Sequence, residues 1–132
     1  MRAVRPIFPR ADSLVVEHAQ GGRLPVVYRV SVDERCFYLR VAEQPDDDLT
    51  TDAQLLDGLR ALGARVPAVV HVEVDPADLD RSFLVMTEVG GQSLGKTPLT
   101  ADVRGVARAA GRDAALINSV VVQGFGRLIR DG

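Results

Sequence analysis

The stretch that decides the fold of this chain runs from Phe83 to Gly95 and reads FLVMTEVGGQSLG. Its first residues, Phe83 to Thr87, form an apolar run of the kind that builds a buried β-strand. The run ends in a single acid, Glu88, and a glycine-rich break follows. Glycine interrupts regular structure because it adopts backbone angles that other residues avoid. We therefore expect a strand that leads directly into a loop or linker.

A helix is predicted upstream of this strand. The acidic run Asp46–Asp48 precedes Thr50 and Thr51, and both threonines are competent helix caps. Apolar residues then recur at helical spacing, at Leu55, Leu56, Leu59 and Leu62. Gly63 comes directly after them, where a helix commonly stops. The acids also suit the positive end of the helix dipole, so a solvated acidic run is favoured here over a metal site.

Four further strands are expected from apolar, β-branched and alternating segments: Leu14–Ala19, Val26–Val32, Cys36–Val41 and Val69–Val74. Gly21 and Gly22 separate the first two, as in a hairpin turn or a loop. With Phe83–Thr87 these segments predict an α+β fold, namely a five-stranded antiparallel sheet with one packed helix. A linker and a C-terminal helical stripe from Val103 to Val120 follow.

Alternation along the strands assigns side chains to the two faces of the sheet, because successive residues point in opposite directions. In the third segment it places Arg40 on the opposite face from Phe37 and Leu39. In the fourth segment it points Val70, Val72 and Val74 inward and His71 and Glu73 outward.

The composition of the chain limits the classes of function that it can have. The chain has 132 residues, about one domain, and 46% of them are hydrophobic. A net charge of −2 gives no electrostatic reason to expect nucleic acid or an anionic membrane as partner. The lone Cys36 fits a reducing compartment, and no apolar run reaches the roughly 20 residues that span a bilayer, so we expect a cytoplasmic protein. Near the start of the chain, Arg2, Arg5 and Arg10 are expected to form a flexible solvated arm.

The order of these elements resembles the small lobe of the aminoglycoside phosphotransferase and choline kinase family, whose fold is like that of protein kinases. FYLRVAE is similar to that family's third strand, and TDAQLLDGLRALGARVPAVV to its helix and following strand. RSFLVMTEVGGQSL resembles its fifth strand and hinge, and LINSVVVQGFGRLIRDG the stretch after the linker.

The resemblance implies roles for two charged residues. Arg40 stands where the family has a cation that touches the nucleotide phosphates and pairs with an acid on the helix. Asp52 is the best match for that acid. A guanidinium is permanently charged and forks to two oxygens, so it does not simply replace a lysine. The alternative from the residues alone is an ordinary ion pair at a sheet edge.

The resemblance also implies ATP, with magnesium, as the cofactor. Gly21 and Gly22 fall where a glycine-containing loop would cover the phosphates with its amides, although a plain hairpin turn is the alternative. Glu88 and Val89 would offer the hinge carbonyl and amide groups to the adenine.

The resemblance divides the chain into a kinase-like lobe at residues 1–95 and, at 96–132, a linker, a helix and the start of a further lobe. Neither catalytic nor metal-binding residues are identified, because no His-x-Asp-x-x-x-x-Asn loop is present. Asp113 and Asn118 imitate its spacing, but they lie in a helical stripe. We therefore expect a truncated enzyme in which this part alone transfers no phosphate.

Three functions remain open at this point. The first is the nucleotide-binding lobe of an ATP-dependent small-molecule phosphotransferase. The second is a standalone relic of such a lobe, which would use its exposed apolar face to form a homodimer or to bind a partner protein. The third is an unrelated α+β binding domain.

Overall fold

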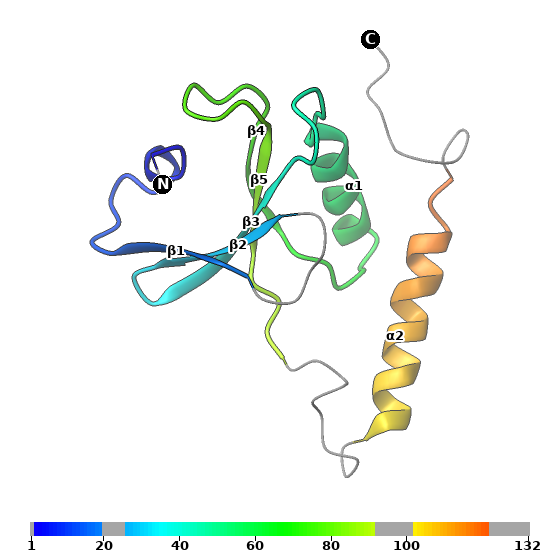
Figure 1. The fold of residues 1–132 in the computed structure, drawn as a ribbon. Coiled ribbons are helices and arrows are strands. Elements are labelled where there is room, and N and C mark those ends of the chain that lie inside the picture. Colours follow the sequence, from blue (N-terminus) through cyan, green and yellow to red (C-terminus); the bar gives the residue numbers. More distant parts are fainter. Residues whose placement is uncertain (1, 20–25, 92–101, 122–132) are drawn as a thin grey trace.

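The computed structural model describes residues 2–19, 26–91 and 102–121. It contains one five-stranded sheet in the order β1-β2-β3-β5-β4, with every neighbouring pair antiparallel (Figure 1). The strands are β1 (Leu14–His18), β2 (Val27–Val32), β3 (Arg35–Val41), β4 (Val69–Glu73) and β5 (Phe83–Thr87). The helix α1 (Thr50–Ala61) lies against one face. The predicted α+β fold, a five-stranded antiparallel sheet with one packed helix, is confirmed.

The turn between β2 and β3 sets the register of the first hairpins. Asp33 has φ 52°, in the left-handed region that aspartate tolerates better than most side chains do. Its carboxylate accepts a hydrogen bond from the amide of Ser13 at 2.8 Å, and its own amide donates to the Ser13 carbonyl at 3.0 Å. The turn is therefore tied to the residue that precedes β1.

The N-terminal segment is part of the core, so the prediction of a flexible solvated arm was wrong. Residues Arg5–Ile7 form a short 3-10 helix, η1, on the face of the sheet opposite α1 (Figure 1). The arginines remain exposed, whereas Val4 and Ala11 are buried. The reason is a contact with a distant segment: these apolar residues join the cluster on the sheet, and Phe8 packs against Phe37 with ring centroids 4.9 Å apart.

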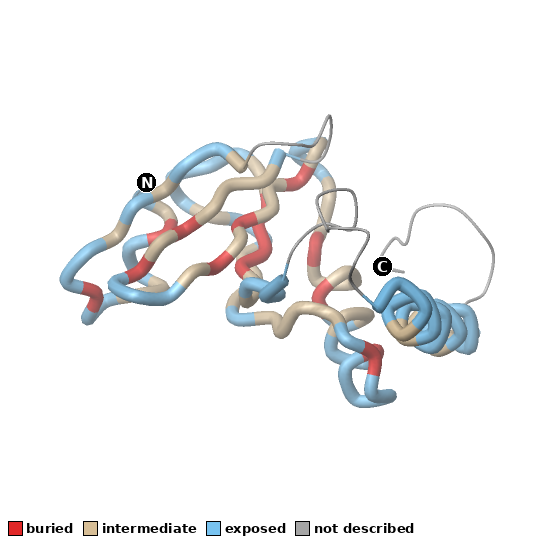
Figure 2. The backbone as a smooth tube through the Cα atoms, turned by 90° about the horizontal axis from the view of Figure 1, so that it is seen from below, coloured by how far each residue is buried: buried red, intermediate tan, exposed pale blue. Residues whose placement is uncertain are grey.

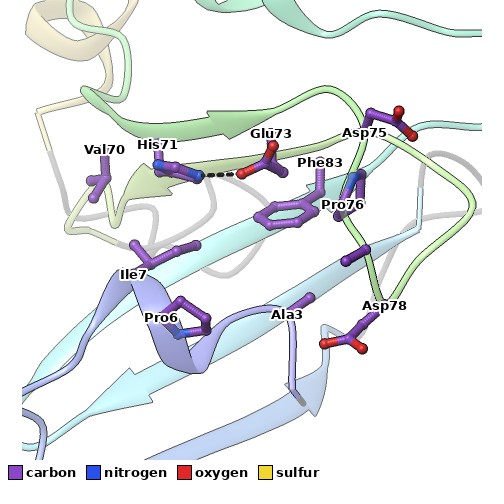
Figure 3. A pocket seen from close by; sticks show the side chains of 11 residues that line it. Ala3, Pro6, Ile7, Val70, His71, Glu73, Asp75, Pro76, Asp78 and Phe83 are labelled. Atoms are coloured by element: carbon purple, nitrogen blue, oxygen red, sulfur yellow. Dashed lines mark hydrogen bonds and ion pairs between the residues drawn. The ribbon is translucent and has the colours of Figure 1, made fainter.

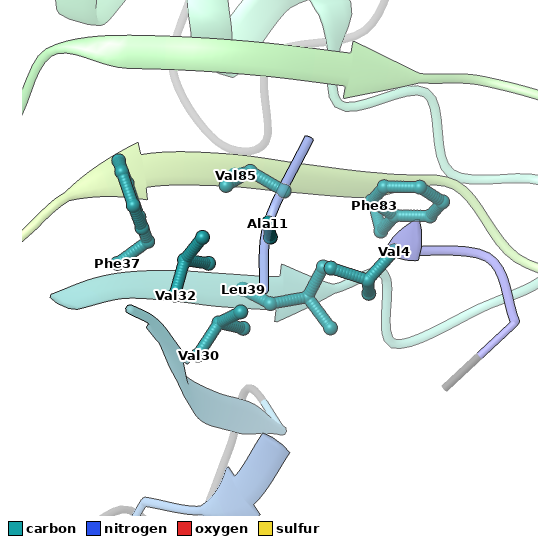
Figure 4. Packing of buried hydrophobic residues seen from close by; sticks show 8 residues of the cluster. All are labelled: Val4, Ala11, Val30, Val32, Phe37, Leu39, Phe83 and Val85. Carbon is teal, nitrogen blue, oxygen red and sulfur yellow. The ribbon is translucent and has the colours of Figure 1, made fainter. Parts of the chain in front are cut away.

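Two apolar clusters, one on each face, hold the sheet between its covering segments. The N-terminal face buries Val4, Ala11, Val30, Val32, Phe37, Leu39, Phe83 and Val85 (Figure 4). The α1 face buries Ala42, Leu49, Ala53 and Leu84. Buried residues therefore concentrate along the central strands rather than along either helix (Figure 2). The predicted face assignment of Phe37 and Leu39 is confirmed.

Strand β4 departs from the predicted alternation. An irregularity between Val69 and His71 shifts the register, so that Val69 pairs with Met86 and His71 with Val85. A bulge of this kind reverses the facing of the residues beyond it. The predicted inward positions of Val70 and Val74 were therefore wrong, since these residues are 39% and 45% exposed. Val72 does point inward and packs against the cluster on the α1 face.

The start of α1 differs from the prediction, whereas its end agrees with it. Leu49 occupies the N-cap position without a side-chain cap, so the predicted capping by Thr50 and Thr51 was wrong. The amide of Thr50 instead donates to the Asp48 carboxylate at 2.7 Å. At the other end Gly63 adopts φ 90°, the conformation expected of a residue that terminates a helix.

A buried serine fastens the start of α1 to the sheet. The Ser82 hydroxyl donates to the Asp47 carbonyl at 2.6 Å and accepts from the Leu49 amide at 3.3 Å. Ser82 directly precedes β5 and is fully buried. It satisfies two backbone groups of the segment before α1 and so keeps the first turn of that helix beside the sheet.

A second helix, α2 (Val103–Asn118), follows the described part of the lobe and has no buried residue. Asp102 caps it by accepting from the Gly105 amide at 2.8 Å. Arg65, in the segment after α1, pairs with Asp113 at 2.8 Å. This contact, mainly the side-chain hydrogen bond from Arg65, lowers the pKa of Asp113. The division of the chain at residues 95 and 96 stays a prediction.

Candidate functional site

The structure brings the two predicted charged residues together. Arg40 lies on β3, Asp52 lies in the first turn of α1, and Arg40 Nη1 is 3.3 Å from Asp52 Oδ2. Their side chains are 30% and 32% exposed, so the pair sits at a partly buried boundary between helix and sheet. An ion pair in that setting is screened less than one on the open surface. The predicted pairing is correct, and its role toward a nucleotide stays a prediction.

The packing around Arg40 explains its orientation. In the sheet register it lies between Val27 on β2 and Leu84 on β5, on the face that α1 covers. Leu84 is fully buried beneath it. Among the residues that the structure describes, Arg40 Nε is the one buried side-chain nitrogen or oxygen without a hydrogen-bond partner. An unmet buried donor costs about 1–3 kcal/mol, so packing and the Asp52 pair must hold the guanidinium in place.

The predicted hinge follows β5 and is exposed. Glu88 and Val89 come directly after Thr87, and the chain then reaches Gly91, whose φ of 130° only glycine adopts easily. Glu88 Oε1 lies 3.9 Å from Arg29 Nη2. The backbone that would meet an adenine is therefore at the exposed end of β5, and its contact with a nucleotide stays a prediction.

Sequence analysis did not identify Arg29 or Tyr38 as site residues. The register aligns Glu17, Arg29, Tyr38 and Met86 in one row across four strands, on the same face as Arg40. Arg29 Nη2 also lies 2.7 Å from the Cys36 sulfur. The alternation that located Arg40 would have located Arg29, had it been applied to the second strand.

A hollow lies on the β1 side of this row. Its volume is about 360 Å³, and it is lined by Glu17, His18, Ala19, Arg29 and Tyr38. A guanidinium and a phenol ring together offer charge and a flat surface, which are the features that an anionic aromatic ligand needs. This hollow has a mostly polar lining, and neither Arg40 nor Asp52 is part of it.

Two further sequence features bear on the site, namely the predicted glycine loop and the acidic run. Gly21 and Gly22 lie outside the described residues, so the phosphate-covering loop stays a prediction. Within the described ranges no group of three or more acidic, histidine or cysteine side chains could hold a metal ion. Asp47 in the acidic run accepts from the Gln44 amide at 3.0 Å, which is a structural contact.

No helix in the described ranges has the length and apolar character needed to cross a membrane.

The five-stranded sheet and its packed helix have the arrangement of a kinase-like small lobe. Residues 15–130 match the sequence model of the phosphotransferase enzyme family, APH, and the chain belongs to that family. This confirms the resemblance drawn from the sequence.

A solved structure extends the likeness to three dimensions. The chain is similar to a Ralstonia eutropha JMP134 protein proposed to be an aminoglycoside phosphotransferase, with 18% sequence identity and a TM-score of 0.55. The match covers 69% of this chain and 27% of that one, so the chain spans little more than a quarter of that structure. At this identity the likeness shows the fold alone. No curated protein sequence matches the chain.

Proposed function

We propose that this chain is the nucleotide-binding lobe of an ATP-dependent phosphotransferase that acts on a small molecule. The observation that carries the proposal is the Arg40–Asp52 pair, 3.3 Å apart, which joins the third strand to the packed helix. Membership of the phosphotransferase family supports the reaction class. The geometry supports the lobe assignment, because the pair lies on the same sheet face as Arg29 and Tyr38.

In this proposal each group has a limited task. Arg40 donates to phosphate oxygens of ATP, and Asp52 holds the guanidinium in the orientation that this requires. The backbone of Glu88 and Val89 binds the adenine edge, and Gly21 and Gly22 supply amides over the phosphates. The nucleotide fits the donor set, since the Arg40 side chain is partly exposed and carries a permanent charge.

Magnesium and the acceptor hydroxyl require groups that we do not assign within this chain. Phosphoryl transfer depends on metal-holding oxygens and on an acid that orients the attacking hydroxyl. Asp113, which imitates such an acid in spacing, lies in α2 and pairs with Arg65. We therefore propose that this chain alone binds ATP, transfers no phosphate and acts in the cytoplasm.

A thermal unfolding titration tests the binding proposal. A ligand that binds only the folded state stabilises it by about 2.7 kcal/mol when its free concentration is about 100 times the dissociation constant. We expect magnesium ATP to raise the unfolding midpoint by several degrees in a saturable manner. Magnesium with inorganic triphosphate controls for non-specific anion binding. An unchanged midpoint at saturating magnesium ATP would refute nucleotide binding by this lobe.

A second candidate function, self-association, is favoured by α2. This helix exposes Val103, Val106 and Ile117, and Val121 just beyond it is 93% exposed. Such a stripe favours association because burying it removes apolar surface from water. Under this proposal sedimentation shows a dimer that Val106→Asp dissociates, whereas the outward-facing Arg108→Asp does not. A monomer at every concentration would contradict it.

A further inference from the structure

A pocket of about 520 Å³ lies on the sheet face opposite the Arg40 site (Figure 3). Four segments build it: η1 and the residues before it, strand β4, the loop between β4 and β5, and the start of β5. Phe83 pairs in the sheet with Val41, and Arg40 pairs with Leu84, so the two sites are on opposite faces. The volume falls within the range of about 300–1,000 Å³ that is typical of small-molecule sites.

The lining has two chemically distinct parts. The floor and one wall are apolar and come from Ala3, Pro6, Ile7 and Phe83. Along β4 the pocket carries the side chains of His71 and Glu73, Asp75 lies at the end of that side, and Asp78 lies near Ala3 on the other side (Figure 3). No lysine or arginine is among the lining residues. The pocket therefore combines an apolar surface with negative charge that no cationic side chain of the lining offsets.

His71 is the one lining residue that could become cationic, and it already faces a carboxylate. Its Nε2 lies 3.3 Å from Glu73 Oε2, and its ring packs near Phe83 with centroids 6.1 Å apart. This contact occupies one oxygen of Glu73, and the carboxylate has further acceptor positions. Glu73 is 44% exposed, so a ligand can reach it.

The spacing of the acids argues against a metal ion as the occupant. None of the described clusters of acidic, histidine and cysteine side chains is close enough to hold a metal. Carboxylates that line a cavity without converging on one point suit a ligand whose charge lies at one end of a larger apolar body. Hydrogen bonds between an ammonium group and a carboxylate are among the stronger polar contacts.

We propose that this pocket binds a small organic ammonium ion with an apolar body. The body would pack on Pro6 and Ile7, which are at least partly exposed, and the ammonium group would donate to Glu73 and to the acids of the β4–β5 loop. The same chemistry is offered by a free amine and by a lysine side chain of a partner protein. The inference does not depend on nucleotide binding, because the residues involved lie on the other face of the sheet.

Calorimetric titration with phenethylamine tests the proposal, with amide NMR shifts to locate the site. We expect shifts at Val70 and His71, and about tenfold weaker binding in Glu73→Gln and in Asp78→Asn, as the loss of one charged hydrogen bond implies. Asp57→Asn, on the exposed side of α1, removes the same charge elsewhere and is expected to change affinity less than about twofold, as a distant surface charge should. The neutral isostere 2-phenylethanol should bind at least about tenfold more weakly than the amine.

Two results would overturn the proposal. One is equal binding of the alcohol and the amine, and the other is an equal loss of affinity in Asp57→Asn and Glu73→Gln. A competition arm then separates the two sources of the ligand. If a blocked lysine peptide displaces phenethylamine and its acetylated form does not, the occupant is a protein side chain. If neither displaces it, the occupant is a free amine.

Discussion

Phe83→Ala is expected to destabilise the lobe by about 3–5 kcal/mol, the usual cost of removing a fully buried ring. Phe83 is 1% exposed and belongs to the cluster that joins the N-terminal segment to the sheet. Its replacement by alanine leaves a cavity between η1 and the central strands, where both sides are anchored by other contacts and cannot fully close. Urea denaturation followed by circular dichroism measures the change in the free energy of unfolding.

The matched control for this variant is Leu62→Ala, which removes a large apolar side chain that is 53% exposed. We expect that control to change stability by no more than about 0.5 kcal/mol. A double-mutant cycle of Phe83→Ala with Val4→Ala adds a test of the packed N-terminal segment. Residues in one cluster are expected to couple by about 0.5 kcal/mol or more. Strict additivity, or a Phe83→Ala cost below about 1 kcal/mol, would contradict the packing of this segment onto the sheet.

Arg40→Met is expected to abolish most of the rise in unfolding midpoint that magnesium ATP produces. The substitution keeps a long apolar stem and removes the guanidinium, so packing against Leu84 is largely retained. Loss of charge-assisted hydrogen bonds worth about 1.5–3 kcal/mol corresponds to about 10- to 150-fold weaker binding. Asp52→Asn should weaken binding less, because it disturbs only the orientation of Arg40. Nucleotide titrations of each variant, followed by unfolding midpoint, give the comparison.

Arg65→Met is the control for Arg40→Met, since it removes an arginine from another arginine–aspartate pair. That pair joins the segment after α1 to α2 and lies outside the proposed nucleotide site. Its loss should leave the nucleotide-dependent rise unchanged. If Arg40→Met and the unmodified chain respond alike to magnesium ATP, the Arg40–Asp52 pair is only a structural contact.

Much of the fold could be predicted because its signals are local. The alternation in β3 separates Arg40 from Phe37 and Leu39 without any knowledge of the neighbouring strands. Gly63 ends α1 because a left-handed residue is needed there, and glycine adopts that conformation at least cost. The pairing of Arg40 with Asp52 was reached through family resemblance, since nothing in the spacing of the two residues dictates it.

Other features could not be predicted because they depend on contacts between distant segments. The N-terminal segment was predicted to be a charged arm, yet its few apolar residues pack against the sheet face that α1 does not cover. The irregularity at Val70 shifts the second half of β4, and only the pairing with β5 reveals it. The start of α1 depends on Ser82, more than 30 residues away in the chain.

The amino-acid sequence by itself determined the strands, the helices and the face of the sheet on which Arg40 lies, because periodicity and glycine placement act over a few residues. Tertiary structure alone decided what covers each face, how β4 is offset and where the two concave surfaces form. Those outcomes depend on which side chains come into contact from distant parts of the chain. Burial of apolar surface stabilises such contacts, but it leaves no local pattern in the sequence. The nucleotide proposal rests on both levels, whereas the amine pocket rests on tertiary structure alone.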